Sequence, residues 1–227
     1  MAAPAEPLQL NNYHSLLTAF TDFLIVAIHT ILFERGLYPP ETFLLTRAYN
    51  FPVRQNRHPL VCKWILDAVS AVQEQMLKGA VRRVVFVIYS DQQEVLERFL
   101  FDVERFPAVP EKEAYTEFES ETGTDAEVKV SKVDVEEQLR ATVRKLAYCG
   151  GKLGELPDGC TYTIAVELKD KANPPIGVSY FCIRPGVMLM VTSIRSLGYL
   201  QYHHYRPERR EPVTGLGVIW GVSRLCL

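Results

Sequence analysis

The feature that most constrains this fold is a helical pattern between Asn12 and Arg35 that is apolar on almost every side. Apolar residues recur there at the three- and four-residue intervals of one broad helical face: Leu16, Leu17, Phe20, Leu24, Ala27, Ile28, Ile31 and Leu32. Phe23, Ile25 and Val26 widen that face, so we expect a central helix that other elements surround. Gly36 supplies a C-cap, and the two prolines that follow it prevent continuation of the helix.

The chain has 227 residues, which suits one α+β domain with a core of its own. Its formal net charge of −2 gives no general attraction for nucleic acid or anionic lipid. We therefore expect no direct sequence-specific nucleic-acid binding. We also expect no membrane association, because no uninterrupted apolar run reaches the ~18 residues of a membrane span. Residues 1–10 lack the pattern of a signal peptide, and the expectation is a soluble intracellular protein.

The five cysteines form no CxxC pair and are odd in number, which argues against a zinc site or a disulfide framework. His203 and His204 lack neighbouring Cys or carboxylate ligands, so we expect no metal. Gly150–Gly151–Lys152 follows a helix and lacks the ending of a phosphate loop, and we interpret it as a helix-capping turn. The sequence offers no catalytic residues and no cofactor motif, and an enzyme is not expected.

The remaining elements follow from local patterns. His58 and Pro59 open a second helix, and β-branched residues from Val81 to Tyr89 predict a strand buried on both faces. The alternation from Val95 to Val103 predicts its hairpin partner. The pattern also predicts an extended stretch at Phe43–Val53, a third helix at Asp134–Cys149, a strand at Cys160–Leu168 and a hydrogen-bonded core histidine at His29.

These elements predict three parts: a flexible N-terminus (1–11), a core domain (12–176) with a mobile acidic loop (111–130), and an atypical tail (177–227).

This order of elements resembles the HORMA family, in which three helices pack on an antiparallel sheet. Phe23–His29, followed by Arg35 and Tyr38–Pro39, is similar to the first helix of that family and its exit. The resemblance runs from about Phe20 to Leu168, apart from the acidic loop.

Two branches of the family compete. Arg35–Phe43 and Val95–Phe99 also resemble the spindle-checkpoint branch. Tyr49–Val53, Trp64–Ile65 after His58–Pro59, and Gly159–Thr163 are more similar to the accessory subunits of DNA polymerase zeta.

The resemblance implies a non-catalytic nuclear adaptor of translesion DNA synthesis, with a cytoplasmic fraction as the alternative location. It would capture a peptide of the polymerase zeta catalytic subunit and bridge it to a second, scaffold-like translesion polymerase. The alternative is a spindle-assembly-checkpoint protein that binds checkpoint and anaphase-promoting regulators. In the family a C-terminal segment, the safety belt, crosses over a peptide that pairs with a sheet edge.

The resemblance also implies the site residues. The peptide would lie on Trp64, Tyr38, Thr161, Thr163 and Ala165, with the strand Cys160–Leu168 as the receiving edge. Arg140 would serve when two HORMA domains pair. Trp64 could instead be a core residue, and Arg140 an ordinary surface charge.

The tail departs from the family's belt. Beyond Pro175 periodicity is lost and Arg, Gly and Ser become frequent. The tail is either a strongly diverged belt or translated non-coding sequence, and the sequence leaves both open.

Overall fold

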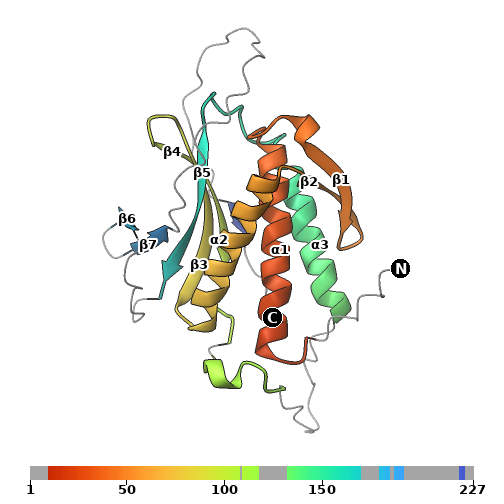
Figure 1. The fold of residues 1–227 in the computed structure, drawn as a ribbon, viewed down its shortest axis with the longest axis vertical. Coiled ribbons are helices and arrows are strands. Elements are labelled where there is room, and N and C mark those ends of the chain that lie inside the picture. Colours follow the sequence, from red (N-terminus) through yellow and green to blue (C-terminus); the bar gives the residue numbers. More distant parts are fainter. Residues whose placement is uncertain are drawn as a thin grey trace.

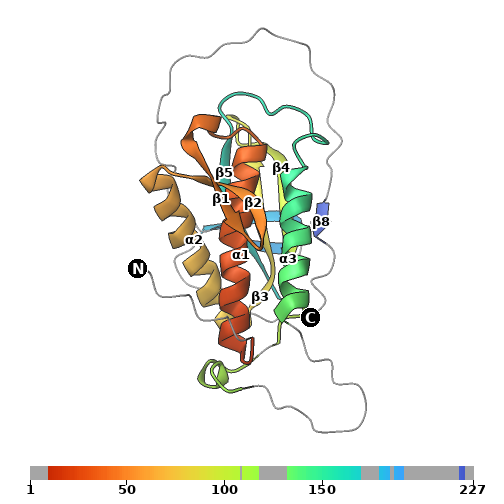
Figure 2. The same ribbon diagram turned by 90° about the vertical axis from the view of Figure 1, so that its right-hand side faces the viewer.

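Three helices lie on one face of a sheet, and the most apolar helix lies between the other two (Figure 1, Figure 2). The computed structural model describes residues 10–107, 109–117, 132–169, 179–184, 187–191 and 220–222. The helices are α1 (Tyr13–Glu34), α2 (Pro59–Leu77) and α3 (Lys132–Ala147). Since α1 contacts both other helices and a hairpin strand, the prediction of a surrounded central helix is confirmed.

Within the described residues the main sheet has six strands in the order β6-β7-β5-β3-β4-β8. The strands are β3 (Val81–Tyr89), β4 (Val95–Asp102), β5 (Thr161–Leu168), β6 (Ser179–Arg184), β7 (Val187–Val191) and β8 (Trp220–Val222). All neighbours are antiparallel except β4 and β8. Residues 84–88 of β3 are buried on both faces, as the β-branched run predicts.

Both ends of α1 are capped by its own sequence. The Asn12 side chain accepts a hydrogen bond from the Ser15 amide at 2.8 Å, which closes a capping box. At the other end Gly36 has φ +62°, and the Leu37 amide donates to the Leu32 carbonyl at 3.1 Å. This is the Schellman arrangement that the glycine predicts.

By length and composition α1 could cross a membrane, contrary to the expectation from uninterrupted apolar runs. However, 72% of its most apolar window is buried inside the domain, which accounts for the composition of this helix.

The segment after α1 is a hairpin rather than one extended stretch. A 3-10 turn (Pro40–Thr42) leads into β1 (Phe43–Ala48), which pairs with β2 (Phe51–Asn56) in a separate two-stranded sheet. Tyr49 and Asn50 have φ +50° and +56°. Positive φ at both central residues defines the two-residue turn whose twist matches paired strands.

The first part of the predicted acidic loop packs against the start of α1. The His14 amide donates to the Ala114 carbonyl at 2.9 Å, and the His14 ring stacks on Tyr115. The Asn11 side chain donates to the Glu117 carboxylate at 2.9 Å, and Ala114 is buried. A short 3-10 turn (Glu111–Glu113) precedes these contacts. Composition did not predict this packing, and residues 118–131 lie outside the described part of the chain.

The glycines after α3 provide the first testable prediction. A Cβ on Gly150 would lie 2.7 Å from the Glu34 carbonyl oxygen, whereas a Cβ on Gly151 would meet nothing within 4 Å. Gly150→Ala is therefore expected to lower the free energy of unfolding by about 1–3 kcal/mol, because backbone must shift to admit the methyl group. Gly151→Ala is the matched control, and urea unfolding of both variants measures the difference. Equal stabilities would contradict the close approach.

His29 is the buried, hydrogen-bonded core histidine that the sequence predicts. Its Nδ1 accepts from the Asn56 amide at 3.3 Å, and burial lowers its pKa to about 4. The unfolded chain therefore binds more protons than the folded one between the ordinary pKa of about 6.5 and about 4. Stability from His29 is complete above that window and is lost as the pH falls through it, by up to about 3 kcal/mol.

The variant His29→Asn tests this pH dependence, since asparagine retains a hydrogen-bond acceptor and does not titrate. Unfolding in urea at neutral pH and near pH 4 should show a smaller loss of stability for the variant than for the natural chain. Parallel pH profiles for the two proteins would exclude His29 as the cause.

Candidate peptide-binding edge

Side chains from four separate segments form an aromatic cluster around Tyr162. The Tyr162 ring stacks on Phe86 at 5.4 Å and meets the Trp64 ring edge-on at 5.0 Å. Tyr38, from the loop after α1, approaches the same ring edge-on at 6.1 Å. Trp64 is 8% exposed and belongs to the main core. Two predicted site residues, Trp64 and Tyr38, are thus brought together by Tyr162, which the sequence-based site did not include.

The cluster contains a hydroxyl pair. The oxygens of Tyr38 and Tyr162 are 2.7 Å apart, and either can be the donor. Burial raises the pKa of both phenols, and the proximity of Tyr38 raises that of Tyr162 further. Both hydroxyls therefore remain protonated at neutral pH. This bond fixes the loop after α1 against the beginning of β5.

β5 has an incompletely paired outer side above this cluster. One side of β5 pairs with β3 along its length, from Thr161 to Leu168. On the other side, β7 pairs only with Ala165–Glu167. Among the described residues no strand pairs with that side at Thr161–Thr163. Reception of a peptide along the whole strand Cys160–Leu168 stays a prediction, and it would require β7 to leave the second half of the strand.

The predicted β5 residues lie on the face opposite the aromatic cluster. Tyr162 packs against the core under the helices, whereas Ala165 packs with Val85 and Val87 on the other face. Strand alternation places Thr161 and Thr163 on that second face too. Alternate side chains of an added strand would contact the face of the sheet that carries Tyr162. The intervening side chains would contact the face that carries Thr163. For Ala165, an added strand would first have to displace Val191 of β7.

An ion-pair ladder crosses the opposite end of the sheet. The Arg83 guanidinium lies 3.1 Å from the Glu167 carboxylate and 3.6 Å from the Asp102 carboxylate. It therefore links β5, β3 and β4 where β7 also pairs. The described ion pairs of β5 thus lie at this end, whereas aromatic contacts and the Tyr38–Tyr162 hydroxyl pair hold the Thr161–Thr163 end.

Arg140 lies apart from this edge, on α3. Its Nε donates to the Tyr49 carbonyl oxygen at 2.7 Å, so the side chain holds the hairpin turn against the helix. Arg140 remains partly exposed. Pairing between HORMA domains through this residue stays a prediction.

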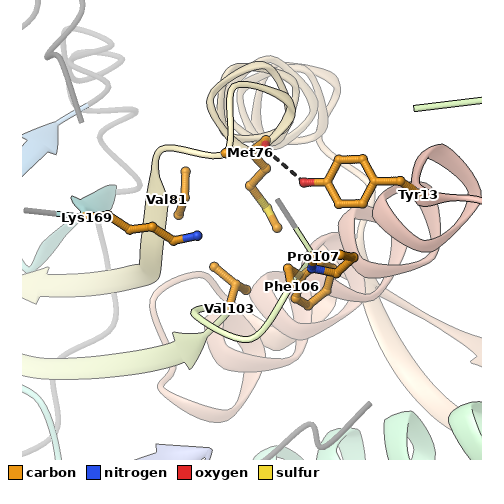
Figure 3. Close-up of a pocket in the computed structure, with 8 residues that line it drawn as sticks. Tyr13, Met76, Val81, Val103, Phe106, Pro107 and Lys169 are labelled. Carbon is orange, nitrogen blue, oxygen red and sulfur yellow. Dashed lines mark hydrogen bonds between the residues drawn. The ribbon is translucent and has the colours of Figure 1, made fainter. Parts of the chain in front are cut away.

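A small pocket lies at the other end of the helices, between Tyr13, Met76, Val103 and Lys169 (Figure 3). The Tyr13 hydroxyl already donates to the Met76 carbonyl at 2.9 Å. Apart from Lys169, the described lining is largely apolar and contains no acid–base pair. Within the described ranges, no three His, Cys, Asp or Glu side chains gather as metal ligands. His203 and His204 lie outside those ranges.

The fold is of the α+β class: three helices pack on an antiparallel sheet, and one strand has a partly open edge. The HORMA domain model matches residues 17–183, and the chain belongs to the HORMA domain family.

Sequence relatives narrow the choice between the two branches of the family. The chain is 36% identical over 155 residues to the "DNA polymerase zeta processivity subunit" of Schizosaccharomyces pombe, covering 66% of this chain and 68% of that protein. It is 32% identical over 152 residues to the "Mitotic spindle assembly checkpoint protein MAD2B" of Danio rerio, covering 67% and 65%. The matches thus span about two thirds of these relatives' length. Identity to the "Mitotic spindle assembly checkpoint protein MAD2A" is 31% for Dictyostelium discoideum and 25% for Mus musculus, and the spindle-checkpoint branch is not favoured over the first relative.

Solved structures support the same fold. The structure titled "Crystal Structure of Mitotic Checkpoint Complex" has a chain with TM-score 0.56 and 19% identity, covering 78% of this chain and 95% of that one. The structure of C. elegans HTP-1 bound to HIM-3 closure motif gives a TM-score of 0.54 at 17% identity, with coverages of 82% and 91%.

Three short strands come from the atypical tail. β6 and β7 extend the main sheet beyond β5, and β8 pairs with Phe99–Phe101 of β4. The sequence did not predict strands there, because the tail has no clear alternation. The rest of residues 177–227 lies outside the described part of the chain. Whether the tail is a diverged belt stays open.

Proposed function

We propose that this chain is a non-catalytic adaptor of translesion DNA synthesis that captures a peptide of the polymerase zeta catalytic subunit on β5. The observation that carries the proposal is the outer side of Thr161–Thr163, which no described strand pairs with, beside the Trp64–Tyr162 aromatic pair. The family assignment and the similarity to a polymerase zeta processivity subunit support it. The relative HTP-1 is described as bound to a closure motif, which is a precedent for capture of a short segment.

The physical basis of capture is β-augmentation. A peptide that pairs with Thr161–Thr163 satisfies main-chain groups on both strands and gains affinity from those hydrogen bonds. Its alternate side chains reach two different surfaces: the aromatic side with Trp64 and the side with Ala165 and Val87. The main-chain hydrogen bonds give the part of the affinity that is independent of peptide sequence, and these surfaces give the part that depends on it. Full-length pairing requires β7 to move, so capture is coupled to rearrangement of the tail.

The bound adaptor would bridge the catalytic subunit to a second, scaffold-like translesion polymerase in the nucleus. The net charge of −2 gives the chain little attraction for DNA, which fits a role through protein contacts. Accordingly, no catalytic step is assigned to any residue.

Backbone-methylated peptides test this mode of binding without changing the protein. A fluorescent peptide from the polymerase zeta catalytic subunit should bind the full chain in an anisotropy titration. N-methylation of the alternate amides that face β5 should weaken binding by at least about tenfold, because each lost donor leaves a carbonyl unpaired. N-methylation of the intervening amides, which face solvent, is the matched control and should change affinity little.

Equal effects of the two methylation patterns would overturn strand addition. Preferential binding of a peptide from a spindle-checkpoint regulator would instead support the alternative branch. Amide NMR signals of Tyr162 and Thr163 should shift on binding, and shifts confined to another surface would also contradict the proposed site.

A further inference from the structure

A second open strand edge lies on the hairpin, away from β5. β1 is the outer strand of the hairpin and lies on the side of β2 away from the helices (Figure 1). Among the described residues β1 pairs with β2 alone. Leu44 and Leu45 on this strand are 52% and 65% exposed. Exposed leucines on an unpaired edge are the features that natural sheets usually avoid.

The hydrogen-bond pattern shows which backbone groups face outward. Ala48 and Phe51 close the two-residue turn, and at the far end the Arg57 amide donates to the Thr42 carbonyl at 2.9 Å. Because amide direction alternates along a strand, the even-numbered residues from 42 to 48 bond to β2. Leu45 and Arg47 therefore direct their N–H and C=O groups away from β2, whereas the Phe43 amide already donates to the Pro40 carbonyl.

The other edge of the hairpin, formed by β2, is protected against pairing with a further strand. By the same alternation Pro52 lies where β2 would offer an outward amide, and proline has none. Further along, the Asn56 amide donates to His29, and the Asn56 carbonyl accepts from the Cys62 thiol at 2.9 Å. β1 carries no proline and its register has no bulge. Of the two hairpin edges, the β1 edge alone thus lacks protection against an added strand.

Charge indicates the partner for this edge. Arg47, Arg54 and Arg57 are exposed on or beside the hairpin, and Arg54 lies over the Phe33 ring at 5.0 Å. Within the described part of the chain none of these three arginines forms a salt bridge. Leu45 and Arg47 lie on the same face as Arg54, since Leu45 pairs with Arg54.

We infer that β1 is a second docking strand, which accepts an extended acidic segment of a partner protein with apolar and acidic residues in alternation. The segment pairs with the outward groups of Leu45 and Arg47 and becomes a third strand of the hairpin sheet. Its acidic side chains lie on the face that carries Arg47 and Arg54, and its apolar side chains cover Leu44 on the other face. This surface is separate from β5, so the adaptor can hold two partners at once.

An amide NMR titration of the full chain tests the inference. The probe is a short peptide in which valine and glutamate alternate, and the matched control peptide has lysine at each glutamate position. The glutamate peptide should shift the amide signals of Leu45 and Arg47 and bind about tenfold more tightly than the lysine peptide.

Two variants separate the backbone contribution from the charge contribution. Leu45→Pro removes an outward amide without a hairpin hydrogen bond, and Arg47→Glu reverses one charge; each should weaken glutamate-peptide binding by about tenfold. Leu66→Ala, at an exposed leucine of α2, should leave binding unchanged. If Leu45→Pro unfolds the hairpin, glutamate-peptide binding by Arg47→Glu still tests the inference.

The inference would be overturned by no shifts on β1, by equal binding of both peptides, by unchanged binding of both variants, or by shifts confined to Thr161–Thr163. Concentration-dependent shifts of the same β1 signals without peptide would assign the edge to a second copy of the chain and would overturn it too. Failure here leaves peptide capture on β5 unaffected, because that proposal rests on different residues.

Discussion

Arg35→Met is expected to lower the free energy of unfolding by about 3–5 kcal/mol, because it leaves a partly buried carboxylate unpaired. Arg35 donates to both carboxylate oxygens of Glu97, through Nε at 2.8 Å and Nη2 at 2.6 Å. The same Nη2 donates to the Gly154 carbonyl at 2.6 Å. The Arg35 side chain is 4% exposed and that of Glu97 16%, so water compensates little for the loss.

Urea unfolding followed by circular dichroism measures the effect, and a double-mutant cycle isolates the pair. Arg35→Met with Glu97→Leu should recover much of the lost stability, since both charges are then absent. Lys63→Met is the matched control: it breaks the exposed Lys63–Asp67 pair and should cost less than about 1 kcal/mol. Similar costs for Arg35→Met and Lys63→Met would contradict a structural role of the buried pair.

Trp64→Ala is expected to lower the free energy of unfolding by about 3–5 kcal/mol and also to weaken peptide binding on β5. The indole is almost fully buried and its edge-on contact with Tyr162 supports the end of β5 that would receive a peptide. The two effects have one cause: without the indole, Tyr162 and the strand that carries it lose their packing.

Met76→Ala provides the comparison that separates the two interpretations of Trp64. Met76 is buried at the far end of α2, and its truncation should cost about 2–5 kcal/mol without affecting the β5 edge. Under conditions where both variants remain folded, Trp64→Ala should bind the catalytic-subunit peptide more weakly than Met76→Ala. Equal peptide affinities would show that Trp64 serves core packing alone.

The sequence predicts best the elements whose signal is local. The apolar spacing from Leu16 to Leu32 and the β-branched run of β3 express burial directly, because nearly every side chain there faces the core. Gly36 predicts a helix end because a left-handed residue is needed there. The sequence pattern does not predict the turn at Tyr49–Asn50, because the Asn-Gly or Asp-Gly pair that marks such turns is absent, although Asn tolerates the positive φ.

The site is less predictable because distant segments form it. The resemblance indicated Trp64 and Tyr38, but only the structure shows that Tyr162 connects them. Strand alternation could have placed Tyr162 on the helix side, opposite Thr161 and Thr163. Pairing of β7 with Ala165 depends on long-range register that no local pattern carries, so the sequence does not show which part of the β5 edge is open.

The aromatic cluster gives the protein an internal optical reporter. Tyr38 and Tyr162 lie next to the Trp64 indole, close enough for light absorbed by the phenols to reappear as indole emission. A strand that docks beside Tyr162 changes the polarity around this indole and so the colour and intensity of its fluorescence. Arrival of a natural, unlabelled ligand can therefore be followed in real time in a stopped-flow instrument.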